Sequence, residues 1–302
     1  MKKILYLLVL FAVIPACLYL ALDRENVDID EFRLNSGYQE VKLSEGITSY
    51  KDIGDKNSKV IILVHGATFG SLAYEEYVNV FLENNYRVIT YDQYGRGYSD
   101  RVHSGVSIEL MEKQLKELIK HCGVEDVILY GVSFGAAVVA KYAANNPENI
   151  SFIGYQVPVI NSANVPLLSI VKIPLYGDLL SRGFLVPGVL KRIEEYEDLM
   201  SKKLLEHYIG QFEVKGTENF FKQFFLGNAM GNRLNDHNII GSKSIPSYFA
   251  YAEDDEEIDS QLVEEAIKNY NNPIVKKYSG GHFFSSGIEK KVAQEFINSI
   301  KK

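Results

Sequence analysis

The sequence predicts an α/β fold: a mostly parallel central sheet flanked by helices, with a helical insertion after the sixth strand. Short apolar runs rich in β-branched residues alternate with amphipathic segments along most of the chain. This pattern is typical of a parallel sheet covered on both faces. The alternation stops near Pro158 and resumes near Ile245, so the insertion lies between these residues. The 302 residues are enough for one large domain and few for two full-sized ones.

The first part of the core is predicted over residues 38–157 and opens with a hairpin. Tyr38–Leu43 and Ile47–Ile53 alternate loosely around a short polar turn. The next apolar runs are either short and continuous, which favours buried strands, or spaced at three to four residues, which favours helices. They predict strands at Lys59–Val64, Arg87–Tyr91, Asp126–Tyr130 and Ser151–Val157, and helices at Leu72–Asn84, Ser107–His121 and Ser133–Asn145.

Residues 158–244 are predicted to form a helical cap. Pro166, Pro174 and Pro187 interrupt this stretch, and its helical spacing covers Val189–Ile209 and Thr217–Asn228. Aromatic residues in such an insertion either line a pocket or bury the inner face of the lid, and the second use is the commoner one. These residues are Tyr196, Tyr208, Phe212, Phe220, Phe221, Phe224 and Phe225.

The core is predicted to resume over residues 245–302. Ile245–Tyr251 and Ile274–Tyr278 are expected as strands, with a helix at Ser260–Tyr270 between them and a last helix from Ser286 to the end. Ligands of open α/β sheets bind at the carboxyl ends of the strands, so the loops after these two strands are candidate site loops.

Composition excludes several classes of protein. The content of 46% hydrophobic and 24% charged residues is that of an ordinary globular protein. A net charge of −7 without a basic stripe argues against nucleic-acid binding, because phosphate contacts require clustered cations. Two cysteines, Cys17 and Cys122, are too few for a disulfide framework or a Cys/His zinc module. No P-loop, dinucleotide turn or metal-ligand cluster is present, so neither a cofactor nor a metal is expected.

Residues 1–22 are predicted to be a signal anchor or a signal peptide. The 19 residues Ile4–Leu22 carry no charge and come directly after Lys2 and Lys3. About 20 apolar residues are needed to cross a bilayer, and basic residues on the N-terminal side of such a run favour export of the rest of the chain. The sequence is compatible with three fates of this segment: retention as an anchor, cleavage as a signal peptide, or lipidation of Cys17. The expected location is membrane-anchored with the rest of the chain extracytoplasmic, or secreted if the segment is cleaved.

A candidate nucleophile lies in the turn after the strand Asp126–Tyr130. Gly131-Val132-Ser133-Phe134-Gly135 matches G-x-S-x-G between a strand and a helix, the context that makes this pattern informative. A serine on so tight a turn has an unfavourable backbone conformation, and the flanking glycines remove Cβ atoms that would clash. We expect the Ser133 hydroxyl to project above the sheet, with a helix N-terminus behind it.

A serine nucleophile requires a general base and a carboxylate that orients the base. His282 stands in a glycine turn after the last strand and is expected at the same sheet edge as Ser133. His121 and His207 are expected to be solvated. The acid is expected from the loop after Ile245–Tyr251, and the resulting order Ser, Asp, His suits this architecture. The acidic residues of that loop are Glu253, Asp254, Asp255, Glu256 and Glu257.

With these residues the chain resembles an α/β-hydrolase from Tyr38 to its C-terminus. Four motifs match in order: His65-Gly66 after a buried strand, the D-x-x-G-x-G-x-S segment Asp92–Asp100, the turn Gly131–Gly135 and the histidine loop Gly281–Phe283. The acid of the family usually follows a strand as G-x-x-D. Here Ala252-Glu253-Asp254-Asp255 fits with alanine in place of glycine, so Asp255 aligns with the acid and Asp254 is the neighbouring alternative.

The resemblance implies Ser133 as nucleophile, His282 as base and Asp255 as the acid that orients it. It also implies an oxyanion hole formed by the backbone N–H groups of Ala67 and Phe134. The remaining motif residues are expected in supporting roles: His65 braces the oxyanion loop, Asp92 and Arg96 shape the neighbouring turn, and Thr68 offers a further hydroxyl.

The predicted function is hydrolysis of a carboxylic ester with a lipid-like or medium-chain acyl group, through an acyl-serine intermediate. A serine nucleophile argues against the dehalogenases and epoxide hydrolases of the family, which use aspartate. A proline-iminopeptidase-like aminopeptidase and a C–C bond hydrolase remain alternatives, although their oxyanion loops carry a glycine-proline pair. The alternative of another class is a non-catalytic ligand-binding protein of the same fold. The oligomeric state stays open. The aminopeptidase would use an acidic patch from Glu194, Glu195, Glu197 and Asp198.

Overall fold

A mixed sheet of eight strands forms the centre of the molecule, in the order β1-β2-β4-β3-β5-β6-β7-β8. The computed structural model describes residues 3, 6, 9–102, 105–161, 171–227 and 229–301. β1 pairs with β2 and β2 with β4 in antiparallel fashion, and the other neighbours are parallel. The predicted fold class is therefore confirmed. The strands are β1 (Gln39–Lys42), β2 (Ile47–Ile53), β3 (Val60–Val64), β4 (Arg87–Tyr91), β5 (Val127–Val132), β6 (Ile150–Gln156), β7 (Ser247–Ala252) and β8 (Ile274–Tyr278).

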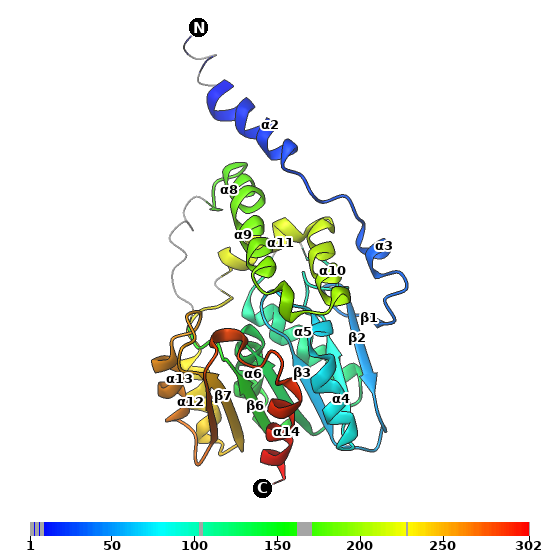
Figure 1. Cartoon of the computed structure of the whole chain (residues 1–302), viewed down its shortest axis with the longest axis vertical. Coiled ribbons are helices and arrows are strands. Elements are labelled where there is room, and N and C mark those ends of the chain that lie inside the picture. Colours follow the sequence, from blue (N-terminus) through cyan, green and yellow to red (C-terminus); the bar gives the residue numbers. More distant parts are fainter. Residues whose placement is uncertain are drawn as a thin grey trace.

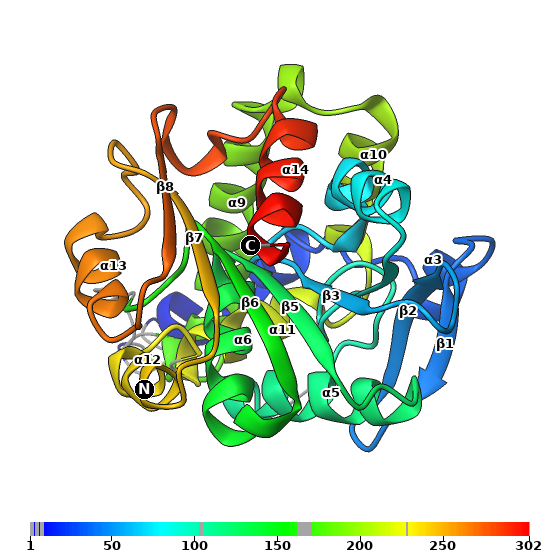
Figure 2. The ribbon, with the colours of Figure 1, turned by 90° about the horizontal axis from the view of Figure 1, so that it is seen from below.

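Helices cover both faces of the sheet and bury one apolar cluster on each face (Figure 2). Strands β3, β4 and β5 are buried along their whole length, as expected for strands with helices on both sides. α4 packs against α14, and α5 packs against α6. The helices of these layers are α4 (Glu75–Glu83), α5 (Ile108–His121), α6 (Phe134–Asn145), α13 (Ser260–Ile267) and α14 (Glu289–Ile300).

Local capping explains where two of these helices begin. The Ser107 hydroxyl accepts a hydrogen bond from the Leu110 N–H at 3.3 Å, so α5 begins one residue after the predicted start. Asp259 caps α13 in the same way, by accepting from the N–H groups of Gln261 and Leu262.

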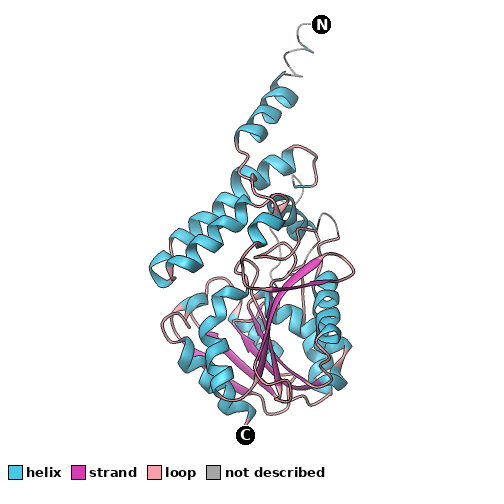
Figure 3. Ribbon diagram, turned by 90° about the vertical axis from the view of Figure 1, so that its right-hand side faces the viewer, coloured by secondary structure: helices cyan, strands magenta, loops and turns pink. Residues whose placement is uncertain are grey.

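Between β6 and β7, four of the α-helices that the structure describes stand over the carboxyl edge of the sheet (Figures 1 and 3). They are α8 (Tyr176–Leu180), α9 (Val186–Glu194), α10 (Lys202–Gly210) and α11 (Thr217–Leu226). The helix expected over Val189–Ile209 is divided, because the Ser201 hydroxyl accepts from the Leu204 N–H and starts α10 as a separate helix.

The segment expected as a cap, residues 158–244, does not form one layer. α12 (Leu234–Ser242) packs against α6 and α13 and so belongs to the helices that cover the sheet. Its buried residues Ile240 and Gly241 explain this position, since a Cβ on Gly241 would lie 1.9 Å from the Asn269 carbonyl oxygen. Residues 162–170, including Pro166, lie outside the described residues.

The N-terminal segment lies on the cap side of the molecule, at the opposite end from the C-terminus (Figure 1). A π-helical turn at Val9–Val13 leads into α2 (Ile14–Ala21), and α3 (Ile29–Arg33) comes next. The first residues of the predicted apolar run Ile4–Leu22 are partly outside the described residues. Within the described part of the chain, no helix combines the length and apolar character that crossing a membrane requires.

Residues 19–33, here called the N-terminal arm, connect this segment to the cap and to the core. Arg182 of the cap donates to the Tyr19 carbonyl at 2.7 Å and pairs with Asp23 at 3.1 Å. The Glu25 carboxylate accepts from the N–H groups of Gly216 and Glu218 at the start of α11. At its other end the arm meets the core, where Arg33 pairs with Asp100 at 2.6 Å. The additional contacts are Val27 with Val214 and Arg33 with the Tyr98 carbonyl.

Candidate active site

The turn between β5 and α6 holds Ser133 in a strained conformation. Ser133 has φ 53° and ψ −119°, a region that L-residues rarely adopt. A Cβ on Gly131 would lie 2.6 Å from the Cα of Ala136, and one on Gly135 would lie 2.1 Å from the carbonyl oxygen of Val64. Both glycines are therefore required by close backbone approach, as the sequence predicted. The half-buried Ser133 side chain remains accessible at the sheet edge.

His282 and Asp255 approach Ser133 from the two loops after β7 and β8. The Ser133 Oγ lies 3.0 Å from His282 Nε2, and His282 Nδ1 lies 2.8 Å from Asp255 Oδ2. An ionised carboxylate only accepts hydrogen bonds, so Nδ1 carries the proton and Nε2 accepts from the Ser133 hydroxyl. The structure thus brings together the three side chains selected from the sequence, in the geometry that a serine nucleophile needs.

Asp255 and Asp254 lie in different positions, and their contacts distinguish the two candidate acids. The Asp255 side chain is fully buried, and its Oδ1 accepts from the Glu257 N–H at 2.8 Å and the Ile258 N–H at 3.3 Å. The exposed Asp254 carboxylate accepts from the N–H groups of Gly280 and Gly281, and these bonds lower the pKa of Asp254. Asp255 therefore orients the imidazole, and Asp254 holds the glycine turn that carries it.

The loop after β3 is held against the serine turn by a buried histidine. His65 Nε2 accepts from the Gln93 N–H at 2.8 Å, so Nδ1 carries the proton and donates to the Gly66 carbonyl at 2.8 Å. Burial lowers the pKa of His65 to about 4, which keeps the ring neutral near pH 7. In a trans peptide the N–H points opposite to the C=O, so the Ala67 N–H faces away from the His65 ring. A Cβ on Gly66 would lie 3.8 Å from the Ser133 Oγ, so this loop borders the hydroxyl.

The second candidate oxyanion donor is the Phe134 N–H at the first position of α6. The first N–H groups of a helix have no intrahelical acceptor and point along the positive end of its dipole. A developing negative charge beside Ser133 would meet this group without displacing a backbone hydrogen bond. The two candidate donors thus belong to the two elements that flank Ser133: Ala67 to the loop after β3 and Phe134 to the first turn of α6.

Arg96 and Asp92 organise the neighbouring turn. Asp92 accepts from the Ser71 N–H at 2.7 Å and the Tyr98 N–H at 2.9 Å. The fully buried Arg96 donates from Nε to the Ala67 carbonyl at 2.7 Å, and burial lowers the pKa of Arg96 to about 9. Its guanidinium lies 4.6 Å from the ring centres of both Phe220 and Phe224 in α11. Arg96 therefore connects the oxyanion loop to the cap.

Other residues proposed from the sequence make different contacts or are exposed. The expectation that His207 is solvated is wrong: it is buried between Phe32 and Tyr98, and neither ring nitrogen has a hydrogen-bond partner among the described residues. The Thr68 carbonyl accepts from Gln211 of the cap. Exposed side chains form the acidic stretch expected for an amine subsite: Glu194, Glu195, Glu197 and Asp198.

The cap aromatics mostly bury the inner face of the cap. Tyr208, Phe212 and Phe220 are at most 1% exposed and belong to the apolar cluster on the α5–α6 face of the sheet. Two contacts bring cap rings toward the site: Tyr208 lies 4.0 Å from Phe69, and Tyr196 lies 4.3 Å from Phe283, measured between ring centres.

Three residues support the site in ways that the sequence did not indicate, although Glu257 was among the acidic residues of the candidate loop. Gln93 orients His65, and Gln156 joins the end of β6 to the histidine loop by donating to the Ser285 hydroxyl at 3.0 Å. Glu257 Oε2 lies 3.7 Å from His282 Nε2. A polar residue closing the apolar strand β6 is the signal that could have indicated Gln156, whereas nothing distinguishes Glu257 within its acidic run.

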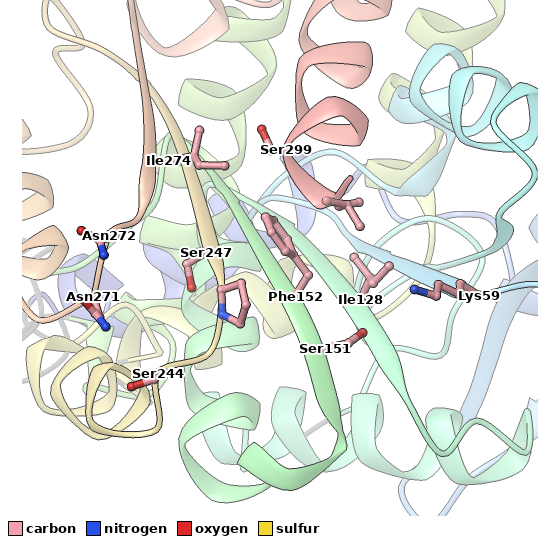
Figure 4. A pocket seen from close by; sticks show the side chains of 12 residues that line it. Lys59, Ile128, Ser151, Phe152, Ser244, Ser247, Asn271, Asn272, Ile274 and Ser299 are labelled. Carbon is pink, nitrogen blue, oxygen red and sulfur yellow. The ribbon is translucent and has the colours of Figure 1, made fainter. Parts of the chain in front are cut away.

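A hollow of about 310 Å³ lies at the opposite edge of the sheet, where the strands begin (Figure 4). Three of its hydroxyls already donate to backbone carbonyls: Ser151 to Val127, Ser247 to Ile245 and Ser299 to Glu295. In the described ranges no three or more His, Cys, Asp or Glu side chains converge to hold a metal ion.

Comparison with known proteins agrees with this architecture. The family model for the alpha/beta hydrolase fold matches residues 59–154. A bifunctional esterase/perhydrolase from Acinetobacter calcoaceticus is 29% identical over 100 residues, which are 33% of this chain and 36% of that protein. A non-heme haloperoxidase from Rhodococcus erythropolis is 22% identical over 76% of this chain and 87% of its own length.

Solved structures extend the likeness in fold to most of the chain. A bromoperoxidase from Bacillus anthracis superimposes with a TM-score of 0.71 at 18% identity, covering 88% of this chain and all of that one. The first curated relatives, in contrast, are matched over only about a third of their length, 33% and 36%. The chain thus has the α/β-hydrolase fold, and residues 59–154 match the family model for that fold.

Proposed function

We propose that this protein is a serine hydrolase that cleaves a carboxylic ester through an acyl-serine intermediate. The observation that carries the proposal is the continuous chain of hydrogen bonds from Ser133 through His282 to the buried Asp255. The loop at Gly66 and the first turn of α6 flank the same hydroxyl, and backbone N–H groups from these elements would support acyl transfer. An esterase among the matched relatives supports the same class of reaction.

In the first half of the reaction, Ser133 Oγ attacks the ester carbonyl while His282 Nε2 takes the hydroxyl proton. The carbonyl oxygen becomes an oxyanion that the N–H groups of Ala67 and Phe134 stabilise, and removing one such donor typically costs about 2.7–4 kcal/mol of activation free energy. Asp255 stabilises the imidazolium and keeps the proton on Nδ1. The imidazolium then protonates the leaving alcohol, which departs as the acyl-serine forms.

In the second half, a water molecule attacks the acyl-serine and passes its proton to His282. The tetrahedral intermediate collapses, releases the carboxylic acid and returns the proton to Ser133 Oγ. The rings of Phe69, Phe283, Tyr196 and Tyr208 pack on one another, and Phe283 packs edge-on against the His282 ring, which gives this side of the site an apolar surface. They support an acyl group of medium or lipid-like chain as the substrate.

A chain-length series of nitrophenyl esters, together with labelling by a fluorophosphonate probe, tests the proposal. We expect turnover and labelling in the wild type and a loss of more than about 10⁴-fold in Ser133→Ala, because the nucleophile itself is removed. Thermal unfolding of the variant should match the wild type, since Ser133 is only half-buried. Ester turnover that persists in Ser133→Ala would refute the mechanism, and a wild type that neither reacts nor labels would favour a ligand-binding protein of this fold.

A second candidate reaction is suggested by the relatives named perhydrolase and haloperoxidase. Hydrogen peroxide that attacks the acyl-serine in place of water would release a peracid and the free Ser133 hydroxyl. Peracid formation in the presence of an ester and peroxide, dependent on Ser133, distinguishes this reaction from simple hydrolysis. The aminopeptidase alternative has less support, because the acidic cap residues proposed for its amine subsite face solvent.

The proposal includes association with a membrane through the N-terminal segment, with the catalytic domain extracytoplasmic or, after cleavage, secreted. The uncharged run Ile4–Leu22 supports it, as do the exposed side chains of Leu10, Phe11 and Leu20, which are 53%, 57% and 69% exposed. Fractionation of cells that express the full chain checks this part: recovery from washed membranes or from the medium supports it, and exclusive recovery in the cytoplasm contradicts it.

A further inference from the structure

A second carboxylate lies beside the nitrogen that is proposed to exchange a proton with the nucleophile. His282 Nε2 lies 3.0 Å from the Ser133 Oγ and 3.7 Å from Glu257 Oε2. The backbone of Glu257 is fixed by its N–H, which donates to Asp255 Oδ1 at 2.8 Å. Asp255 therefore orients the imidazole with one oxygen and positions Glu257 with the other.

The cap supplies a cation to this second carboxylate. Arg192 of α9 forms an ion pair through Nη2 with Glu257 Oε1, the oxygen that does not face His282. The Arg192 guanidinium also lies 5.6 Å from the ring centre of Phe283, the residue after the histidine. One turn later in the chain, Tyr196 packs on the same ring. Arg192 and Tyr196 thus connect the cap to the histidine loop.

The charges around His282 come from two elements. Asp254, Asp255 and Glu257 belong to the loop after β7, and Arg192 belongs to α9 of the cap. The serine turn and the loop at Phe69, which also border the site, contribute a hydroxyl and a ring. Among these groups, Arg192 is the one cation in the described surroundings of the imidazole.

We propose that Glu257 and Arg192 are positioning residues for the base, an inference that rests on the proposed function. Arg192 neutralises Glu257 and holds its carboxylate away from Nε2, which leaves this nitrogen to Ser133 and then to the leaving group. Without Arg192, the carboxylate favours the imidazolium and accepts its Nε2–H, because a nearby anion stabilises the charged form of histidine. The cap thereby controls how readily the base returns to its neutral form.

The test is a double-mutant cycle on Arg192 and Glu257, in which the titration of His282 and the rate of ester hydrolysis are measured. In Arg192→Met the midpoint of the His282 imidazole titration, followed by NMR and assigned with His282→Gln, should rise by about one pH unit, a tenfold change in proton affinity. The acid limb of the pH–rate profile for a short nitrophenyl ester should move upward with it. Arg192→Met combined with Glu257→Gln should restore the wild-type midpoint, because no free carboxylate then faces Nε2.

A matched control is another ion pair between cap and core. Lys203 of α10 pairs with Glu75 of α4 at 3.3 Å, and both side chains are more exposed than those of the proposed pair. Lys203→Met should leave the His282 midpoint unchanged. An unchanged midpoint in Arg192→Met, or an equal shift in Lys203→Met, would overturn the proposal. If the His282 midpoint shifts as expected but the protein has no esterase activity, the proposed function is rejected, while the coupling between Arg192, Glu257 and His282 still holds.

Discussion

The sheet edge that carries Ser133 and the cap that stands over it are held by different kinds of contact. At the sheet edge, strand ends and buried hydrogen bonds from Gln93 and Gln156 hold each loop. The cap is held by its buried aromatic face, by partly exposed ion pairs such as that of Arg192, and by the N-terminal arm. The difference indicates that the groups proposed to react stand on the part held by strands and buried hydrogen bonds, and that the cap is placed to supply the proposed substrate contacts and electrostatic adjustment.

The two regions also differ in how protonation acts on them. In the core, burial lowers the pKa of His65 to about 4 and that of His237 to about 3. In the cap, burial raises the pKa of Glu218 to about 7, although Arg182 opposes the shift, and Glu218 Oε1 has no hydrogen-bond partner among the described residues. Lowering the pH therefore destabilises the folded core and stabilises the cap in its docked position.

The largest effect that we expect is a difference in activity between substitutions of two neighbouring aspartates at the sheet edge. Asp255→Asn should lower kcat by about 10⁴-fold, because the amide favours the wrong tautomer of His282. Asp254→Asn is the matched control and should cost far less, since Asp254 only accepts from the N–H groups of an exposed turn. Rates on one nitrophenyl ester decide the point. Equal losses in the two variants would contradict the assignment of Asp255.

A pair of glycine substitutions compares the packing of the two regions. Gly135→Ala should destabilise the protein by about 1–3 kcal/mol, because its Cβ would lie 2.1 Å from the carbonyl oxygen of Val64. Gly188→Ala, at an exposed position of α9, meets no atom within 4 Å and should stabilise by up to about 1 kcal/mol. Urea unfolding of both variants measures the difference. A tolerated Gly135→Ala would show that the serine turn is less tightly packed than the geometry indicates.

The smallest effect concerns the docking of the cap at different pH values. Glu218 binds its proton more tightly in the folded protein than at its ordinary pKa of 4.5, so its contribution is full below pH 4.5 and is lost as the pH rises through about 7. Hydrogen exchange of α11, corrected for intrinsic rates, should show more protection at pH 5.5 than at pH 8. Glu218→Gln should remove this dependence, whereas Glu206→Gln on an exposed face should retain it. Protection of α11 that is independent of pH in the wild type would contradict this account.

Because of the buried histidines, we expect the stability of the sheet to have the opposite pH dependence. The stability that neutral His65 and His237 contribute is complete above pH 6.5 and is lost as the pH falls toward 4 and 3, because the unfolded chain binds the protons that the core excludes. The amides of β5 and α6 should therefore lose protection in acid over the range in which those of α11 gain it.

Much of the fold was predictable because its signals are local. Continuous β-branched runs indicate β3 to within a residue and β4 at its observed bounds, since buried parallel strands require apolar side chains on both faces. The serine turn was predictable for the same reason: the close backbone approach at Gly131 and Gly135 requires glycine whatever the rest of the chain does. The break between α9 and α10 was missed, because one capping serine outweighs the helical spacing around it.

The sequence by itself determined which residue types and turns were available for chemistry: a strained serine, a histidine on a glycine turn and a run of acids. Only the tertiary structure decided that Asp255 faces the histidine while Asp254 holds the turn, that His207 is buried and that Glu257 meets a cap arginine. The physical reason is the distance along the chain over which the interactions act. Backbone conformation depends on neighbours along the chain, whereas hydrogen bonds between loops depend on strand order and register, which are set by the packing of the whole sheet.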